Sequence, residues 1–144
     1  MTPTMSVNAP PVVIVATHGR FGEELVESAS MILGPLDGFR SISLLPGMDP
    51  AGFGDLLRDE LDNAGPGAIV LTDLFGGTPS NVAAVVAGKR GNLVISGVNL
   101  PLLIEIESQR SQLAEDSGAV EAALAAGRDG IRDITALMRE RAGS

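Results

Sequence analysis

The sequence has no cysteine, no tryptophan and no tyrosine, and it has a single histidine, His18. Without cysteine the chain can form neither a disulfide nor a thiolate metal site, and it has no thiol nucleophile. A cluster of imidazole ligands is excluded too, because it would need more than one histidine. We therefore expect no metal site.

Basic residues are also few: 10 Lys and Arg stand against 18 Asp and Glu, which gives a formal net charge of −8. Nucleic-acid binding needs clustered basic side chains that neutralise phosphates, so nucleic acid is excluded as a partner. The apolar run Val12–Ala16 is too short for a signal peptide core or a membrane span. We expect a cytoplasmic protein that does not insert into a membrane.

Aromatic residues make up only 3% of the chain, but hydrophobic residues make up 44%. The core must therefore consist mainly of Val, Ile, Leu and Ala. A chain of 144 residues fits one domain. We expect residues 1–10, which are rich in Pro, Thr, Ser and Asn, to form a flexible tail, and residues 11–144 to form a single domain.

Strand and helix patterns alternate along the chain. Apolar and β-branched runs predict strands at 12–17, 40–45, 68–72 and 93–96. Helical spacing predicts helices at 21–33, 50–63, 79–89 (capped by Thr78), 102–114 and 118–127. This alternation with short connections is typical of a parallel α/β sheet with right-handed crossovers. Residues 131–138 fit either a helix or a strand.

Three segments rich in Gly, Pro and polar side chains directly follow predicted strands: Thr17–Arg20, Thr72–Pro79 and Gly97–Pro101. In open α/β sheets, ligands bind beyond the carboxyl ends of the strands. The three segments therefore predict one shared site at this edge of the sheet.

His18 and Asp73 are the two candidate catalytic residues. A lone histidine is most often a surface or structural residue, but this one ends a strand and is the only imidazole that could act as a nucleophile. Asp73 is either a turn former or an acceptor for one ring nitrogen of His18. In the second case it fixes the tautomer and leaves the other nitrogen free to attack.

Gly76, Gly77 and Thr78 precede a predicted helix, where backbone N–H groups and a hydroxyl can bind phosphoryl oxygens. The alternative is an ordinary glycine-rich turn with a helix cap. The sequence has neither a P-loop motif nor GxGxxG, so nothing indicates a nucleotide, and we expect no cofactor. There is also no G-x-S-x-G motif of a serine hydrolase.

Three segments, VVIVATHG (Val12–Gly19), LTDLFGGTPSN (Leu71–Asn81) and ISGVNLP (Ile95–Pro101), resemble signatures of the mannose-family enzyme IIA domain of the bacterial sugar phosphotransferase system. The resemblance implies that His18 is the phosphorylated histidine and that Asp73 is the carboxylate paired with it. It also implies that Thr78 belongs to the active-site loop. Five further residues are expected to line the site: Thr17, Gly19, Phe75, Asn99 and Pro101.

The resemblance further implies a doubly wound α/β fold with four parallel strands and helices on both faces. An antiparallel edge strand, exchanged between the subunits of a homodimer, would correspond to residues 131–138. Functionally, it implies a phosphoryl carrier that is charged by the phosphocarrier HPr and passes the group to a IIB component for sugar uptake. We expect IIB on a separate chain, since this one ends at Ser144, and association with the membrane subunits IIC and IID.

Three other functions remain open at this stage. The same histidine chemistry would serve a regulatory phosphorelay protein that reports carbon or nitrogen status without sugar transport. It would also serve the phosphoryl-donor subunit of a dihydroxyacetone kinase, which has a related fold. A small-molecule enzyme of flavodoxin-like fold is the third alternative.

Overall fold

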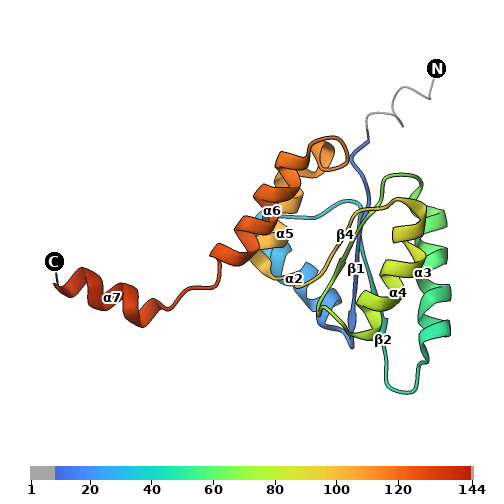
Figure 1. Cartoon of the computed structure of the whole chain (residues 1–144), viewed down its shortest axis with the longest axis horizontal. Helices are drawn as coiled ribbons and strands as arrows, with labels where there is room; N and C mark the ends of the chain where they lie inside the picture. The colour runs from blue at the N-terminus through green and yellow to red at the C-terminus, as the bar shows by residue number, and fades with distance from the viewer. Residues whose placement is uncertain (1–8, 144) are drawn as a thin grey trace.

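The computed structural model describes residues 9–143 and contains a four-stranded parallel sheet in the order β2-β1-β3-β4 (Figure 1). Its strands are β1 (Val13–His18), β2 (Phe39–Leu44), β3 (Ile69–Thr72) and β4 (Val94–Ile95). β1 pairs with both β2 and β3, and β3 pairs with β4. The parallel α/β class and all four strands are as predicted. Most of the tail expected at residues 1–10 lies outside the described residues.

The helices are α2 (Phe21–Leu33), α3 (Pro50–Ala64), α4 (Thr78–Val86), α5 (Leu100–Gln109), α6 (Ser117–Asp129) and α7 (Ile134–Gly143), with short 3-10 turns η1 (Gly88–Arg90) and η2 (Arg110–Gln112). The prediction for residues 21–33 is confirmed to the residue. α5 begins earlier than expected because the Asn99 side chain caps it, accepting a hydrogen bond from the backbone N–H of Leu102. Within residues 9–143, no helix combines the length and the apolar character that a membrane span requires.

Both faces of the sheet are covered, as the continuous apolar pattern of β1 requires. Val13 and Val15 face a core shared with α2, α5 and α6. Ile14 and Ala16 face a second core, on the side of α3 and α4. Figure 1 shows the two helical layers on opposite sides of the sheet. The strand between them is therefore held rigidly up to its last residue.

The strand order reverses direction between β1 and β3. The chain leaves β1 through α2 to reach β2 on one side, and α3 then returns it to β3 on the other side of β1. In doubly wound sheets, the crevice that binds ligands opens at such a switch point. The topology thus places the residue that ends β1, His18, beside the residue that follows β3, Asp73.

The C-terminal segment is a helix in the single chain, where an antiparallel edge strand was expected at residues 131–138. Exchange of this segment between two copies stays a prediction. α7 extends away from the sheet and its covering helices (Figure 1). A strand needs a neighbour for its backbone hydrogen bonds, whereas a helix satisfies them locally. Asp133 favours the helix, because its carboxylate accepts from the backbone N–H of Ala136.

Candidate functional site

His18 ends a strand whose other five residues are buried, and its side chain emerges at the surface with 47% exposure. Gly19 follows with φ of +54°, a left-handed conformation that turns the chain toward α2. Thr17 is fully buried beneath this turn. Its hydroxyl accepts from the backbone N–H of Gly22 at 2.8 Å and donates to the Gly19 carbonyl at 3.3 Å. Thr17 and Gly19 thus shape the turn that presents His18.

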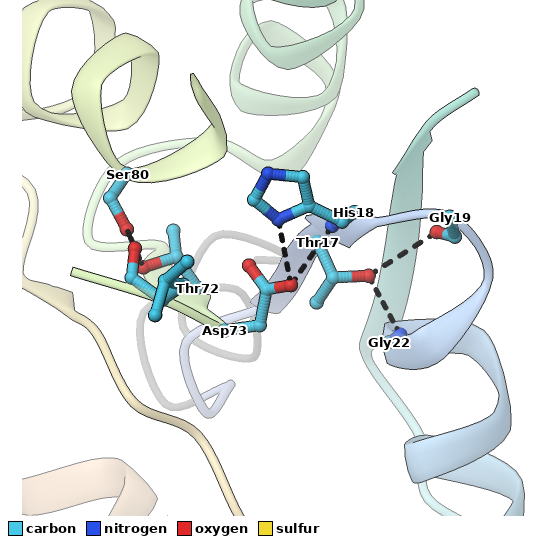
Figure 2. A network of polar contacts seen from close by, with 8 residues as sticks. Thr17, His18, Gly19, Gly22, Thr72, Asp73 and Ser80 are labelled. Carbon is cyan, nitrogen blue, oxygen red and sulfur yellow. Dashed lines mark hydrogen bonds and ion pairs between the residues drawn. The ribbon is translucent and has the colours of Figure 1, made fainter. Parts of the chain in front are cut away.

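Asp73 lies directly against His18, as Figure 2 shows. His18 Nδ1 is 3.0 Å from Asp73 Oδ2, and the backbone N–H of His18 donates to the same oxygen at 3.1 Å. A carboxylate only accepts hydrogen bonds, so Nδ1 carries the proton of the neutral ring. The lone pair is then on Nε2, which is the arrangement that a nucleophilic imidazole needs.

The carboxylate of Asp73 is much less exposed than the ring it faces, at 14%. Its second oxygen, Oδ1, is buried and has no hydrogen-bond partner within the part of the chain that the structure describes. Few other donors therefore compensate the negative charge of Asp73. Such a carboxylate stabilises a positive charge on the neighbouring imidazole.

Gly77 packs against the other edge of the His18 ring. A Cβ at this position would lie 2.7 Å from His18 Cε1 and 3.3 Å from Nε2. The backbone φ of Gly77 is −85°, which any residue can adopt. Glycine at this position is thus explained by the closeness of the ring. At Gly76 the reason differs: φ is +89°, and nothing lies within 4 Å of an added Cβ.

The N-terminus of α4 differs from the sequence prediction by one residue. Gly77 is the cap and forms no side-chain cap bond, and the helix begins at Thr78, so Thr78 is not the cap we expected. Pro79 has no N–H to offer. The Thr78 hydroxyl therefore does not serve as the helix cap.

Of the remaining expected residues, Phe75 is on the loop beside the site and is 87% exposed. Asn99 and Pro101 both contact helices in this structure, and their expected place in the site stays a prediction. The Asn99 amide caps α5 and donates to the Gly127 carbonyl at 3.0 Å. Pro101 is packed so closely on Gly130 that a Cβ there would overlap it. Both residues fasten α5 to α6.

Two buried hydroxyl groups beside the pair were not predicted as site residues. Thr72 Oγ1 and Ser80 Oγ lie 2.7 Å apart, and Ser80 also donates to the Leu74 carbonyl. In Figure 2 they lie on one side of the His18–Asp73 pair, and Thr17 lies on the other. The only signal in the sequence is that a Thr and a Ser stand at the two ends of residues 72–80, the segment that we call the Asp73 loop.

The site is an open surface with one nucleophile. The described residues contain no group of three or more His, Cys, Asp or Glu side chains arranged to hold a metal ion. What the arrangement offers is an accessible Nε2, a paired carboxylate and a helix N-terminus. These groups suit the reversible transfer of a small anionic group between proteins.

Comparison with known proteins gives consistent matches. The family profile described as PTS system fructose IIA component matches residues 12–124. The mannose-specific EIIAB component of Escherichia coli K12 is 30% identical over 133 residues, covering 90% of this chain but 41% of that protein. The fructose-specific EIIA component of Bacillus subtilis is 33% identical over 105 residues, covering 71% and 72%. The structure of a mannose/sorbose-specific IIA subunit from Enterococcus faecalis aligns with a TM-score of 0.77 and 30% identity, covering 87% of this chain and 95% of that one.

Proposed function

This chain belongs to the EIIA-man family of phosphotransferase-system IIA components, and we propose that it is a cytoplasmic phosphoryl carrier in which His18 is the site of phosphorylation. The donor is phospho-HPr, and the acceptor is a IIB component that supports sugar uptake. One observation carries the proposal: Asp73 binds Nδ1 at 3.0 Å, while the His18 side chain remains 47% exposed. The nitrogen opposite Asp73 is thereby free to receive the group.

The transfer is an exchange between two nitrogen atoms. The lone pair of His18 Nε2 attacks the phosphorus of the donor's phosphohistidine, and the P–N bond of the donor breaks, with its electrons left on the donor nitrogen. The Nδ1 proton stays in the hydrogen bond to Asp73. The positive charge that develops on the His18 ring is stabilised by the carboxylate, so the reaction needs positioning and electrostatics rather than a strong acid or base.

The N-terminus of α4 is suited to bind the oxygens of the transferred group. Gly77 is the cap of this helix and lies against the Nε2 edge of the ring. Backbone N–H groups at a helix N-terminus attract anions, and the Thr78 hydroxyl adds a donor. We assign phosphoryl binding to Gly76, Gly77 and Thr78 on this basis.

The surface around His18 is suited to a protein partner. Four exposed apolar side chains come from the segments that follow β1, β2 and β3: Phe21 begins α2, Leu45 follows β2, and Leu74 and Phe75 follow β3. Leu45 is near His18 because the register pairs His18 with Leu44. A few buried residues, large aromatic ones prominent among them, contribute most of the affinity at many protein interfaces. We propose that HPr and IIB both dock over these side chains.

We also propose that the chain forms a homodimer through its C-terminal segment. Four apolar side chains there are exposed in the single chain: Ile131, Ile134, Leu137 and Met138. Packing against a second copy would bury them. Sedimentation equilibrium of the full chain and of a version ending at residue 130 measures whether the C-terminal segment is needed to form the dimer. A dimer of equal stability after truncation would contradict a role for this segment.

A chase experiment tests the carrier function. The chain is phosphorylated with phosphoenolpyruvate, enzyme I and HPr, separated from them, and mixed with IIB from a mannose-type system. We expect the phosphoryl group to leave the chain at the rate at which it appears on IIB. If a chain that accepts the group from HPr transfers it to no IIB, transport is the wrong role and regulation remains.

A further inference from the structure

We propose that Thr72 and Ser80 form a buried hydroxyl bridge that positions the Asp73 loop and so sets the tautomer of His18. The two are positioning residues, since they act through the loop that carries Asp73 and Gly77. The inference rests on the proposed function, because its importance is for phosphoryl transfer. It concerns residues outside the His18–Asp73 pair and outside the helix N-terminus that would bind the phosphoryl group.

The bridge has a defined direction. The Ser80 hydroxyl has one proton, which it donates to the Leu74 carbonyl, since a carbonyl cannot donate. The hydrogen bond of 2.7 Å between the two hydroxyls must therefore be donated by Thr72 to Ser80. The chain of donation runs from Thr72 through Ser80 to Leu74.

The bridge closes the loop at its base. Thr72 is the last residue of β3, and Ser80 lies in the first turn of α4. The Leu74 carbonyl also accepts from the Gly77 backbone N–H at 3.3 Å. One oxygen is thus bound by both Ser80 and Gly77, which fixes the backbone between them. Asp73, which binds Nδ1 of His18, and Gly77, which packs against the ring, are held from the same point.

The position of the bridge is unusual for a purely structural polar pair. Thr72 is fully buried and Ser80 is 8% exposed, so neither hydroxyl is needed for solubility. An apolar pair of similar shape in such a place is often as stable as a buried hydrogen-bonded pair. A hydrogen bond, however, fixes direction as well as distance. Such directional control is useful directly beside Asp73, whose Oδ2 must meet two donors of His18 at once.

The test uses the fact that His18 is the only histidine. In protein labelled with ¹⁵N-histidine, long-range ¹H–¹⁵N spectra report the tautomer of one ring without overlap. We expect the Nδ1–H tautomer in the unchanged protein. Thr72→Val removes the hydroxyl and keeps the shape, so we expect a mixture of tautomers. We also expect single-turnover phosphorylation by phospho-HPr to slow by about ten- to a hundredfold.

Four further variants accompany Thr72→Val. Thr72→Ser removes a methyl group but keeps the hydroxyl, so it should retain both the tautomer and the rate. Ser80→Ala should reproduce the Thr72→Val effect, and the double variant should be no slower than the slower single one, because the two hydroxyls act in one chain. Ser30→Ala removes a hydroxyl that donates to the Glu27 carbonyl in α2, away from the site, and should change nothing.

The outcomes test the positioning role of Thr72 and Ser80 separately from the carrier function. If Thr72→Val and Ser80→Ala, both folded by circular dichroism, keep the tautomer and the rate of the unchanged protein, the positioning role is wrong and the carrier function is untouched. A tautomer shift with normal transfer would contradict the claim that the bridge matters for phosphoryl transfer. If the unchanged protein takes no phosphoryl group but the tautomer still depends on Thr72, the bridge stands and the carrier function fails.

Discussion

Replacing Gly77 by alanine tests the geometry around His18 most sharply. The added Cβ would lie 2.7 Å from His18 Cε1, whereas ordinary contacts begin at 3.4 Å. The ring must therefore move by about 0.7 Å. A ring displaced by that amount loses the geometry in which Nδ1 lies 3.0 Å from Asp73 Oδ2 and Nε2 faces the donor. Misplacement of a reacting group by about 1 Å can cost about a hundredfold in rate.

We expect Gly77→Ala to slow single-turnover phosphorylation by phospho-HPr about ten- to a hundredfold. The fold should survive, because φ of −85° suits alanine, and the loss of a glycine cap costs less than about 1 kcal/mol. The rate is measured by rapid quench and intact mass, and the stability by thermal unfolding.

Gly76→Ala is the matched control. There the added Cβ meets nothing within 4 Å, but φ is +89°. The left-handed conformation costs an alanine about 1–2 kcal/mol, so this variant should lose more stability than Gly77→Ala and less activity. A Gly77→Ala protein that is phosphorylated at the unchanged rate would show that the space beside the His18 ring does not control its position. So would a Gly76→Ala protein that is the slower of the two.

Three further predictions concern the pair, the docking surface and the core. Asp73→Asn replaces the charged acceptor of the His18 hydrogen bond by a neutral one. A hydrogen bond to a charged group is worth about 1.5–3 kcal/mol, so the single-turnover rate should fall about ten- to 150-fold. An unchanged rate would contradict the pairing. Phe75→Ser should raise the KM for phospho-HPr about five- to thirtyfold and leave phosphorylation by the small donor phosphoramidate unchanged; equal losses with both donors would argue against docking. Phe53→Ala should lower the unfolding free energy by about 3–5 kcal/mol in urea titrations, because the ring is fully buried; a loss under 1 kcal/mol would contradict its place in the core.

The sequence was sufficient to predict the sheet because its local signals agree. The apolar run of β1 requires helices on both faces of the sheet, and glycine and proline residues mark where those helices begin and end. The position of His18 beside Asp73 follows from the same topology, since the strand order reverses between the strands that they end. A contact that follows from the strand order, such as that between His18 and Asp73, could therefore be predicted from the sequence pattern.

Details that depend on competing hydrogen bonds were not predictable in this way. Asn99 could have pointed into the site, but its amide is used by α5 and α6. The Thr72–Ser80 bridge depends on which hydroxyl is buried beside which carbonyl, and spacing alone does not encode that. Residues 131–138 have no fixed pattern, and their conformation depends on which backbone partners are present.

The carrier function depends on phosphorylation of His18, which can be measured on the intact chain. The chain and its His18→Ala variant are incubated with phosphoenolpyruvate, enzyme I and HPr, and their intact masses are compared. We expect one acid-labile phosphoryl group on the unchanged chain and none on the variant. No added mass with HPr from several sources, or an equal gain on His18→Ala, would contradict it.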